Sequence, residues 1–192
     1  IPTLPLNTGA LGCAVREFGD MAVRHRRHFD RLTGWESNLP RSSYSKSAIE
    51  IDACSFVGFL VRAEAARQIN PPSAAFFLAY DDTDYSLRLQ DAGWHLWLVP
   101  GSVVLHLRTP DARLSKSPFG GKHYLNIRNR LIVKRRYARW RFLATIDGIA
   151  YGLILWLKAG GWKSLAQSHL LLDSFRDGLE GKQGPAPGQQ DA

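Results

Sequence analysis

The sequence predicts a mixed α/β fold on three observations. Residues 49–62 (IEIDACSFVGFLVR) are dense in strand-forming side chains. From Val103 to Arg108 apolar and other side chains alternate, as they do along a strand with one buried face. After residue 122 the apolar positions recur at the helical period, so helices are expected in the last third of the chain.

The composition is that of one globular domain: 192 residues, of which 45% are hydrophobic and 22% are charged. The net charge of +8 indicates an anionic partner, which is nucleic acid, a phosphorylated small molecule or an acidic membrane surface. Cys13 and Cys54 provide neither a metal-ligand spacing nor a disulfide framework, and they fit a reducing compartment. Because the chain begins with Ile1, we expect a fragment, and the missing signal peptide says little about targeting.

The first 47 residues carry few regular signals. Residues 11–15 suit a short strand, and residues 21–32 (MAVRHRRHFDRL) suit a basic helical turn or two. The cluster RHRRH at residues 24–28 has two interpretations, a phosphate-binding group or a solvated basic face, and the second is the more ordinary one.

The middle of the chain is expected to be a strand followed by a short helix. Gly58 interrupts the strand-forming residues 49–62, and an interior strand glycine often marks a bulge or a close backbone approach. Residues 63–69 suit a short helix that Pro71 and Pro72 stop. The apolar segment 76–78 then leads into two aspartates, which places them at the edge of the core.

Residues 81–108 (DDTDYSLRLQDAGWHLWLVPGSVVLHLR) form the most informative stretch. Asp81 and Asp82 suit a helix start, because acids there meet unpaired N–H groups, and Gly93 suits the left-handed helix end. A strand, a turn at residues 100–101 and a second strand carrying His106 are expected to follow. Folding of this unit would bring His106 near the two aspartates, although an ordinary helix start and an ordinary strand-end histidine explain the same residues.

The remainder divides into a loop, two helical regions and a tail. Residues 109–121 are expected to be a loop, either a mobile flap over a site or a plain surface loop. Residues 122–142 predict a helix crowded with arginines and lysines, which suits a membrane interface or nucleic-acid phosphates. The apolar run 149–157 is too short to span a bilayer, and residues 165–179 predict an amphipathic helix that lies on a membrane or packs on its neighbours. The tail from residue 181 is expected to be disordered.

Four motifs in order resemble one enzyme family: SFVGFLVR, FFLAYDDTDYSLRLQDAGW, LVPGSVVLHL and YLNIRNRL. Together they resemble the C-terminal half of inverting family 2 glycosyltransferases of the GT-A fold, nearest to galactofuranosyl- and rhamnosyltransferases of surface polysaccharide synthesis. The resemblance runs from about Asp52 to about Gly181. It implies the C-terminal, acceptor-side part of a GT-A domain over 1–121, a basic amphipathic helical region over 122–180 and a disordered tail over 181–192.

The resemblance also implies roles for individual residues. Asp82, the second acid of the pair, would be the catalytic base, and His106 would bind the divalent cation, Mn or Mg, that holds the nucleotide diphosphate. Asp81 would contact the sugar or the acceptor hydroxyl. The remaining candidates for substrate binding or positioning are Asp84, Tyr124, Arg128 and Arg130, with Asn129 in the same motif.

The same resemblance implies the partners and the setting. The donor would be a UDP- or dTDP-sugar and the acceptor a glycan or a lipid-linked glycan. The enzyme would be cytoplasmic and peripheral at an anionic membrane surface, the inner face of the plasma membrane, with no nucleic acid bound. The D-x-D motif of the nucleotide-binding half has no match here, so this chain alone is expected to be inactive. The rival interpretation is a basic module that is not an enzyme and that binds nucleic acid or anionic membrane through residues 122–142.

Overall fold

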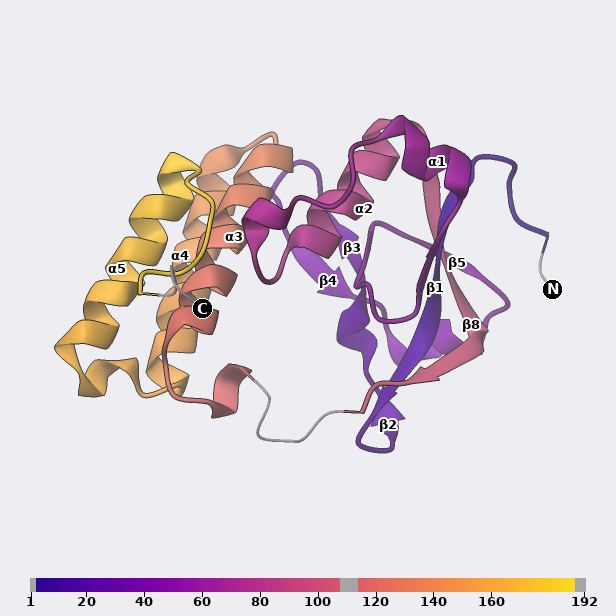
Figure 1. The fold of residues 1–192 in the computed structure, drawn as a ribbon. Helices are drawn as coiled ribbons and strands as arrows, with labels where there is room; N and C mark the ends of the chain where they lie inside the picture. The colour runs from indigo at the N-terminus through magenta and orange to yellow at the C-terminus, as the bar shows by residue number, and fades with distance from the viewer. Residues whose placement is uncertain (1–2, 108–113, 189–192) are drawn as a thin grey trace. The chain divides into compact units, whose positions relative to one another are not determined.

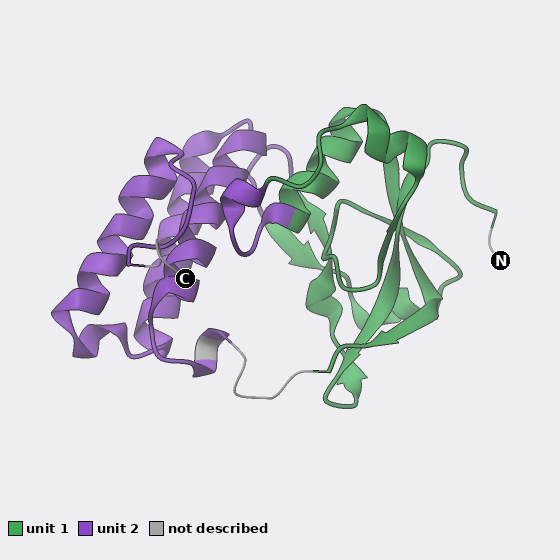
Figure 2. Ribbon diagram, viewed as in Figure 1, with its two compact units in different colours: residues 1–29, 36–73, 82–108 green, residues 30–35, 74–81, 109–192 purple. Residues whose placement is uncertain are grey.

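The structure, a computed structural model, describes residues 3–107 and 114–188, without the side chain of Ser115. It confirms a mixed α/β architecture with two compact units, shown in green and purple in Figure 2. Unit 1 comprises residues 1–29, 36–73 and 82–108, and unit 2 comprises residues 30–35, 74–81 and 109–192. The division differs from the expected boundary at residue 121, because two earlier segments belong with the C-terminal helices.

Unit 1 is built on a five-stranded sheet, drawn in Figure 1 around its long strand β1 (Thr8–Glu17). The strand order is β2-β1-β8-β5, and β7 also pairs with β1. Strands β1 and β8 are parallel, and the other pairs are antiparallel. The partner strands are β2 (Asp20–Met21), β5 (Ile49–Ile51), β7 (Phe59–Val61) and β8 (His95–Leu105).

A second, three-stranded sheet replaces the helix expected at residues 21–32. Short helix η1 (Val23–His25) is followed by β3 (Arg26–Phe29), which pairs antiparallel with β4 (Glu36–Asn38) and β6 (Ala53–Cys54). The helix prediction is wrong because Arg26–Phe29 finds strand partners on both sides, β4 and β6, which local sequence does not reveal. Its two buried residues, Arg26 and Phe29, lie on opposite faces of the strand. The expected solvated basic face is also wrong at Arg26, which is 0% exposed.

Backbone carbonyls make the burial of Arg26 possible. Its guanidinium donates to the carbonyls of Cys13 (3.0 Å), His25 (2.7 Å) and Val57 (2.7 Å), among others. A buried cation is tolerated when its donors are paired in this way. Sequence periodicity carries no signal for such partners, because they come from three separate segments.

The strand expected at residues 49–62 is instead three short strands, β5, β6 and β7, in two sheets. Gly58 lies between β6 and β7 with a φ of +64°, and a Cβ there would lie 2.9 Å from Cγ2 of Val104 and 3.0 Å from Cβ of Cys13. The predicted close approach of the backbone at this glycine is therefore confirmed. Both the positive φ and the contact require glycine.

Unit 1 also contains two α-helices and a short 3-10 helix between its strands. Helix α1 (Ala63–Gln68) ends before the two prolines as predicted, and α2 (Asp81–Asp91) begins at the aspartates and is followed by Gly93 at φ +85°. Helix η2 (Arg41–Ser45) lies between β4 and β5. The helices and the larger sheet bury one apolar core, formed by Ala10, Leu39, Ile51, Cys54, Ala65, Tyr85, Leu89, Leu96 and Leu98.

Strand β8 corrects the expected turn at Pro100-Gly101. The strand continues from His95 to Leu105, and its register against β1 jumps from Val99 opposite Cys13 to Val103 opposite Ala14. Residues 100–102 are thus a bulge within one strand, where a proline without an N–H is tolerated. The chain does not reverse, so His106 emerges beside the end of β1.

Unit 2 is a bundle of three helices that lie side by side in Figure 1, α3 (Gly121–Tyr137), α4 (Arg141–Lys158) and α5 (Leu165–Glu180). Glycines allow close packing: a Cβ on Gly148 would lie 2.4 Å from Cδ2 of Leu131, and one on Gly152 would lie 2.5 Å from Cε1 of Phe175. The short helices are η3 (Ala74–Phe76), η5 (Leu114–Lys116) and η6 (Gly161–Lys163). The core consists of Phe119, Ile127, Leu131, Leu155 and Leu171.

The helix predicted at residues 122–142 is confirmed as α3 up to Tyr137, and residues 141–142 belong to the next helix, α4. The cations of α3 are not all on the surface. Arg128 is 1% exposed and Lys134 is 0% exposed. Helix α3 packs on both α4 and α5, so it has little free face, and the carboxylate of Asp147 accepts from Lys134 Nζ at 2.6 Å. No helix among the described residues is long and apolar enough to cross a membrane.

The expected loop and tail differ in part from what the structure shows. Residues 109–113 of the loop lie outside the described residues, and the rest includes η5. The tail is packed over residues 181–188: the N–H of Gly184 donates to the carbonyl of Ala75 at 2.8 Å, and Ala186 is 0% exposed. Disorder is therefore the wrong prediction for these residues, because their backbone has partners in unit 2. Residues 189–192 lie outside the described residues.

Candidate metal centre

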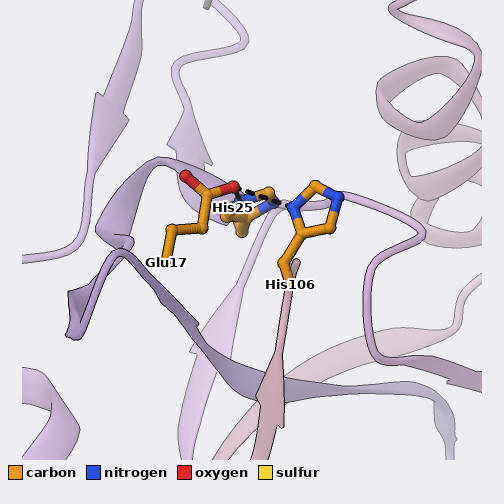
Figure 3. A group of neighbouring side chains, drawn as sticks. All are labelled: Glu17, His25 and His106. Atoms are coloured by element: carbon orange, nitrogen blue, oxygen red, sulfur yellow. Dashed lines mark hydrogen bonds and ion pairs between the residues drawn. The ribbon is translucent and has the colours of Figure 1, made fainter. Parts of the chain in front are cut away.

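Three side chains from distant parts of unit 1 meet at one end of the large sheet (Figure 3). Glu17 is the last residue of β1 and His106 follows the last residue of β8. Because Arg16 and Leu105 are paired in the parallel register, the residues after them emerge side by side. The N–H of His106 donates to the carbonyl of Arg16 at 2.9 Å and fixes this arrangement.

The third member of the group, His25, is the last residue of η1, which follows the β1–β2 hairpin. Its Nε2 lies 3.0 Å from Oε1 of Glu17, and Nδ1 of His106 lies 2.8 Å from the same oxygen. The two imidazole rings stand 5.7 Å apart in an edge-to-face arrangement. One carboxylate oxygen therefore joins both histidines.

The Glu17 carboxylate is buried and its second oxygen is bound to Arg24. Burial alone would raise the pKa of Glu17, but the hydrogen bonds from His25 and His106 and the charge of Arg24 outweigh it. The pKa of Glu17 falls to about 2, so the carboxylate is ionised at neutral pH.

His25 is held in its neutral form. Burial lowers its pKa, and its Nδ1 lies 2.7 Å from the hydroxyl of Ser55, which can donate to it while Nε2–H donates to Glu17. Ser55 thereby fixes the orientation of the ring. To bind a metal ion through Nε2, the neutral ring would take the other tautomer, in which Nδ1–H donates to the Ser55 hydroxyl and Nε2 exchanges its hydrogen bond to Glu17 for the ion.

The three side chains suit a divalent transition-metal ion. Their ligand atoms all lie within 4.8 Å of one another, and two imidazoles with one carboxylate are a recurring donor set for such ions. Ser55 and Arg24 act on the outer atoms of His25 and Glu17, as outer partners of metal ligands do. His106 is one-third exposed, so an ion here would keep positions open to a substrate.

Asp82 lies in the first turn of α2, outside this group. Its Oδ1 accepts from the backbone N–H of Thr83 at 2.6 Å and lies 4.0 Å from a guanidinium nitrogen of Arg27. The structure groups His106 with Glu17 and His25, and this group does not include the aspartates. The expected approach of His106 to the two aspartates stays a prediction. Asp81, the preceding residue, begins the helix and is half-buried. The predicted catalytic role of Asp82 stays a prediction.

The other predicted site residues have structural partners. Asp84 is 1% exposed and binds Arg88 Nε at 2.9 Å. Tyr124 is 2% exposed and its hydroxyl donates to Asp177 at 2.6 Å. The Asp84 pair lies within α2, whereas the Tyr124 pair joins α3 to α5. Contact of either residue with a substrate stays a prediction.

The arginines of the RNR motif are anchored inside unit 2. Arg128 donates to the carbonyl of Gly184 at 2.7 Å, which ties the tail to α3. Arg130 binds Asp147 at 2.9 Å and donates to the hydroxyl of Tyr80 at 2.5 Å. These contacts give both arginines a structural role, and substrate positioning by them stays a prediction.

Glu17 and His25 were missed from the sequence. His25 was noted only as a member of the basic cluster at residues 24–28, and nothing in the sequence around Glu17 distinguishes it. The parallel pairing of β1 with β8 brings Glu17 to His106 across 89 residues, and only knowledge of that pairing would have identified the group.

Comparison with known proteins gives one distant relationship. No protein-family model matches the chain. Over 96 residues, which are 50% of the chain, the sequence is 26% identical to the galactofuranosyltransferase GlfT2 of Mycobacterium tuberculosis. The matched stretch is 14% of the length of that protein. The similarity supports a glycosyltransferase relationship at this coarse level.

Proposed function

We propose that the chain is part of an inverting family 2 glycosyltransferase of the GT-A fold. It would serve the transfer of a sugar such as galactofuranose or rhamnose from a UDP- or dTDP-sugar to a glycan or lipid-linked acceptor in cell-surface polysaccharide synthesis. The observation that carries the proposal is the 26% identity to a galactofuranosyltransferase over half the chain. The chain spans a small part of that relative, so the activity is proposed for the whole protein that contains it.

Asp82 is the proposed general base. An inverting transfer is an in-line displacement at the anomeric carbon by an acceptor hydroxyl, and a carboxylate within hydrogen-bond reach must take that proton. Asp82 is half-buried at the start of α2, with Oδ1 held by the N–H of Thr83. Asp82 would take the proton of the acceptor hydroxyl, and Asp81 would contact the sugar or the acceptor.

His106, with Glu17 and His25, is the proposed holder of the divalent cation. The cation would neutralise the charge that grows on the leaving nucleoside diphosphate. Mg²⁺ prefers oxygen ligands, whereas two imidazoles favour a transition-metal ion, so of the two expected ions Mn²⁺ fits these side chains better. The residues themselves orient one another: Glu17 fixes the ring of His106 and Ser55 fixes that of His25.

The rival function, a basic module for nucleic acid, has weaker support. Arg128 and Lys134 are buried, and Arg130 is bound to Asp147, so three of the cations expected on the binding face of residues 122–142 are engaged inside unit 2. Nucleic-acid binding needs cations free to meet phosphates. Association with the inner face of the plasma membrane stays a proposal.

The test compares two variants in the full-length protein. Asp82→Asn should lower sugar transfer by at least ~10²-fold, because an amide cannot accept the proton, and should leave metal-dependent nucleotide binding intact. His106→Ala should weaken nucleotide binding and raise the metal concentration needed. Asp91→Asn, at the other end of α2, is the matched control and should behave like the parent.

A melting curve accompanies each variant, because loss of a helix-start carboxylate costs about 0.5–2 kcal/mol. Near-normal turnover of Asp82→Asn at saturating acceptor would remove Asp82 as the base. A full-length protein without transfer activity on any nucleotide-sugar donor would contradict the proposed function itself.

A further inference from the structure

A groove of about 560 Å³ opens on unit 2 where α4 ends and α5 begins. Three segments form its walls: residues 116–118 at the end of η5, residues 157–160 at the end of α4, and residues 162–164 together with Gln167 at the start of α5. Its volume lies in the range of ligand sites and exceeds the space that a single small ion fills. The groove shares no residue with the candidate metal centre of unit 1.

The shape of the groove is fixed by the turn that follows α4. Gly160 has a left-handed φ of +70°, and a Cβ on Gly161 would lie 2.0 Å from Cδ1 of Trp156, so the backbone of the turn lies directly against this ring. Both positions therefore require glycine. The N–H of Phe119 donates to the carbonyl of Ala159 at 3.2 Å, which ties the segment after η5 to the same turn. The walls are thus held by backbone contacts and do not depend on the flexible ends of side chains.

The groove is basic. Each of its three segments contributes one exposed lysine, namely Lys116, Lys158 and Lys163. No acidic side chain is among the described residues that line the groove. The only acid from residue 114 to residue 167 of the sequence is Asp147, and its carboxylate is bound to Lys134 inside the bundle. Lysines gathered without a neighbouring acid attract an anionic ligand.

An aromatic ring lies beside these charges. Trp162 is 60% exposed, and Nζ of Lys163 lies 5.7 Å from the centroid of its ring. The uncharged polar side chains of the lining are two hydroxyls and one amide, those of Ser117, Ser164 and Gln167. The C–H face of a sugar ring packs on an exposed tryptophan, and hydroxyls and amides suit the hydroxyl groups of a sugar. The ligand that fits these groups combines sugar rings with negative charges.

The exposure of the lining favours a chain over a small molecule. Pockets for small ligands enclose most of the ligand, whereas Trp162 and the three lysines are all exposed to solvent. A single-stranded nucleic acid is also an anionic chain, but its bases stack on successive aromatic rings. Trp162 is the only aromatic side chain among the described residues of the lining, so a charged polysaccharide fits the groove better.

We propose that this groove binds an anionic polysaccharide, a chain whose sugars carry carboxylate or phosphate groups. One sugar ring packs on Trp162, and the lysines bind the charged groups beside it. The choice of a polysaccharide rests on the proposed function, since a glycosyltransferase of this kind handles a glycan acceptor. The inference adds that the acceptor is charged, and that it has a second place of attachment that shares no residue with the groups proposed for the transfer.

The test measures binding by calorimetry with the 192-residue chain and defined oligosaccharides. Tetragalacturonate carries a carboxylate on every sugar, phosphorylated mannopentaose carries phosphate, and maltotetraose is the neutral counterpart. At least one charged probe should bind ~10-fold or more tightly than maltotetraose, and the difference should shrink as salt rises. If neither charged probe bound more tightly than maltotetraose, the groove would not be a site for an anionic chain.

A pair of double variants assigns the charged part of the binding to the groove. K158A/K163A should weaken binding of the charged probe about 3- to 10-fold. Its control, K46A/R67A, removes two exposed cations from unit 1 and should keep most of the binding. Melting curves check that the variants stay folded. Equal losses in the two variants would mean that the probe responds only to net charge, and the proposal would fail.

A second pair tests the aromatic ring. Trp162→Ala should weaken binding about 3- to 10-fold, whereas Trp35→Ala, at an exposed tryptophan of unit 2 outside the groove, should leave it nearly unchanged. Equal effects of the two substitutions would contradict stacking on Trp162. If a short oligouridylate bound more tightly than both charged oligosaccharides, and K158A/K163A lost that binding, the groove would belong to nucleic acid and the proposal would be wrong.

The full-length protein separates this inference from the proposed function. Sugar transfer by a protein that binds neither charged oligosaccharide would overturn the inference and leave the proposed function in place. Binding that K158A/K163A and Trp162→Ala both weaken, in a protein without transfer from any nucleotide-sugar donor, would support the groove as a polysaccharide site and overturn the proposed function.

Discussion

The amide nitrogen of Asn129 donates to the carbonyl of Leu78 at 2.7 Å, across 51 residues of sequence. The same nitrogen lies 2.9 Å from the carbonyl of Phe76 and 3.0 Å from that of Ala79. The segment it holds is strained: Phe77, Ala79 and Tyr80 all have a φ of +64° to +66°. Non-glycine residues in this region cost on the order of 1–3 kcal/mol each, so the segment persists because partners such as Asn129 determine it.

Asn129→Ala should lower the free energy of unfolding by about 2–4 kcal/mol, because the carbonyls of Leu78 and Ala79 lose the donor inside unit 2 that holds their strained segment. Protection from hydrogen exchange should fall over residues 77–80, which lead directly into Asp81. Asn126→Ala is the control on the same helix, where the side chain accepts only from the hydroxyl of Tyr151, and it should cost about 1 kcal/mol or less. If Asn129→Ala and Asn126→Ala lost the same stability and the same protection, Asn129 would not be what stabilises residues 77–80.

Arg26→Lys should destabilise the protein although it keeps the charge. The guanidinium of Arg26 reaches carbonyls of three segments, and one ammonium group cannot reproduce that fork. We expect a loss of about 2–4 kcal/mol in urea unfolding, since buried carbonyls are left without donors. Arg67→Lys, at an exposed position of α1, should stay within about 0.5 kcal/mol of the parent. A small effect at Arg26 would mean that water replaces the lost donors.

Tyr124→Phe tests the buried pair of Tyr124 and Asp177. Burial, together with the hydrogen bond to Asp177, raises the pKa of Tyr124 to about 12 from about 10. A raised folded-state pKa stabilises the fold below pH 10, and that stability is lost as pH rises from about 10 to 12. The variant should lose about 1–3 kcal/mol at pH 7, and its gap to the parent should narrow over that window. A gap that is constant up to pH 12 would contradict the raised pKa.

The parts of the fold that local sequence determines were predicted well. The helix start at the two aspartates, its end at Gly93, and the short helix before the prolines depend on backbone capping and on breakers within a few residues. The close approach at Gly58 was also predicted, although this glycine lies between two short strands and not inside one. The α/β class follows from periodicity, and the GT-A fold itself stays a prediction.

The predictions that were wrong concern residues whose structure depends on partners far away in the sequence. Residues 21–32 look like a basic helix until the carbonyls that surround Arg26 are known. Pro100-Gly101 looks like a turn until β1 offers a parallel partner on both sides of it. Because residues 100–102 form a bulge and not a turn, His106 reaches Glu17, a contact that the sequence did not predict. The site expected around the aspartates stays a prediction.

Glu17→Gln should separate the metal centre from a merely hydrogen-bonded cluster. The amide can still accept from one histidine, but it is a poor ligand, so the affinity of the tag-free chain for Mn²⁺ or Co²⁺ in calorimetry should fall by ~10-fold or more. Glu50→Gln is the matched control, because Glu50 also pairs with a histidine, His95, but the two are exposed and lie outside the three-residue group. With Co²⁺, the parent should show visible absorption bands that Glu50→Gln keeps and Glu17→Gln alters.

If both variants weakened binding equally, the ion would be bound by scattered surface groups, and Glu17 would serve only to join the two histidines. If neither the parent nor the control bound Co²⁺ measurably, these residues would hold no ion by themselves, and Glu17 would keep the structural role that its hydrogen bonds already give it.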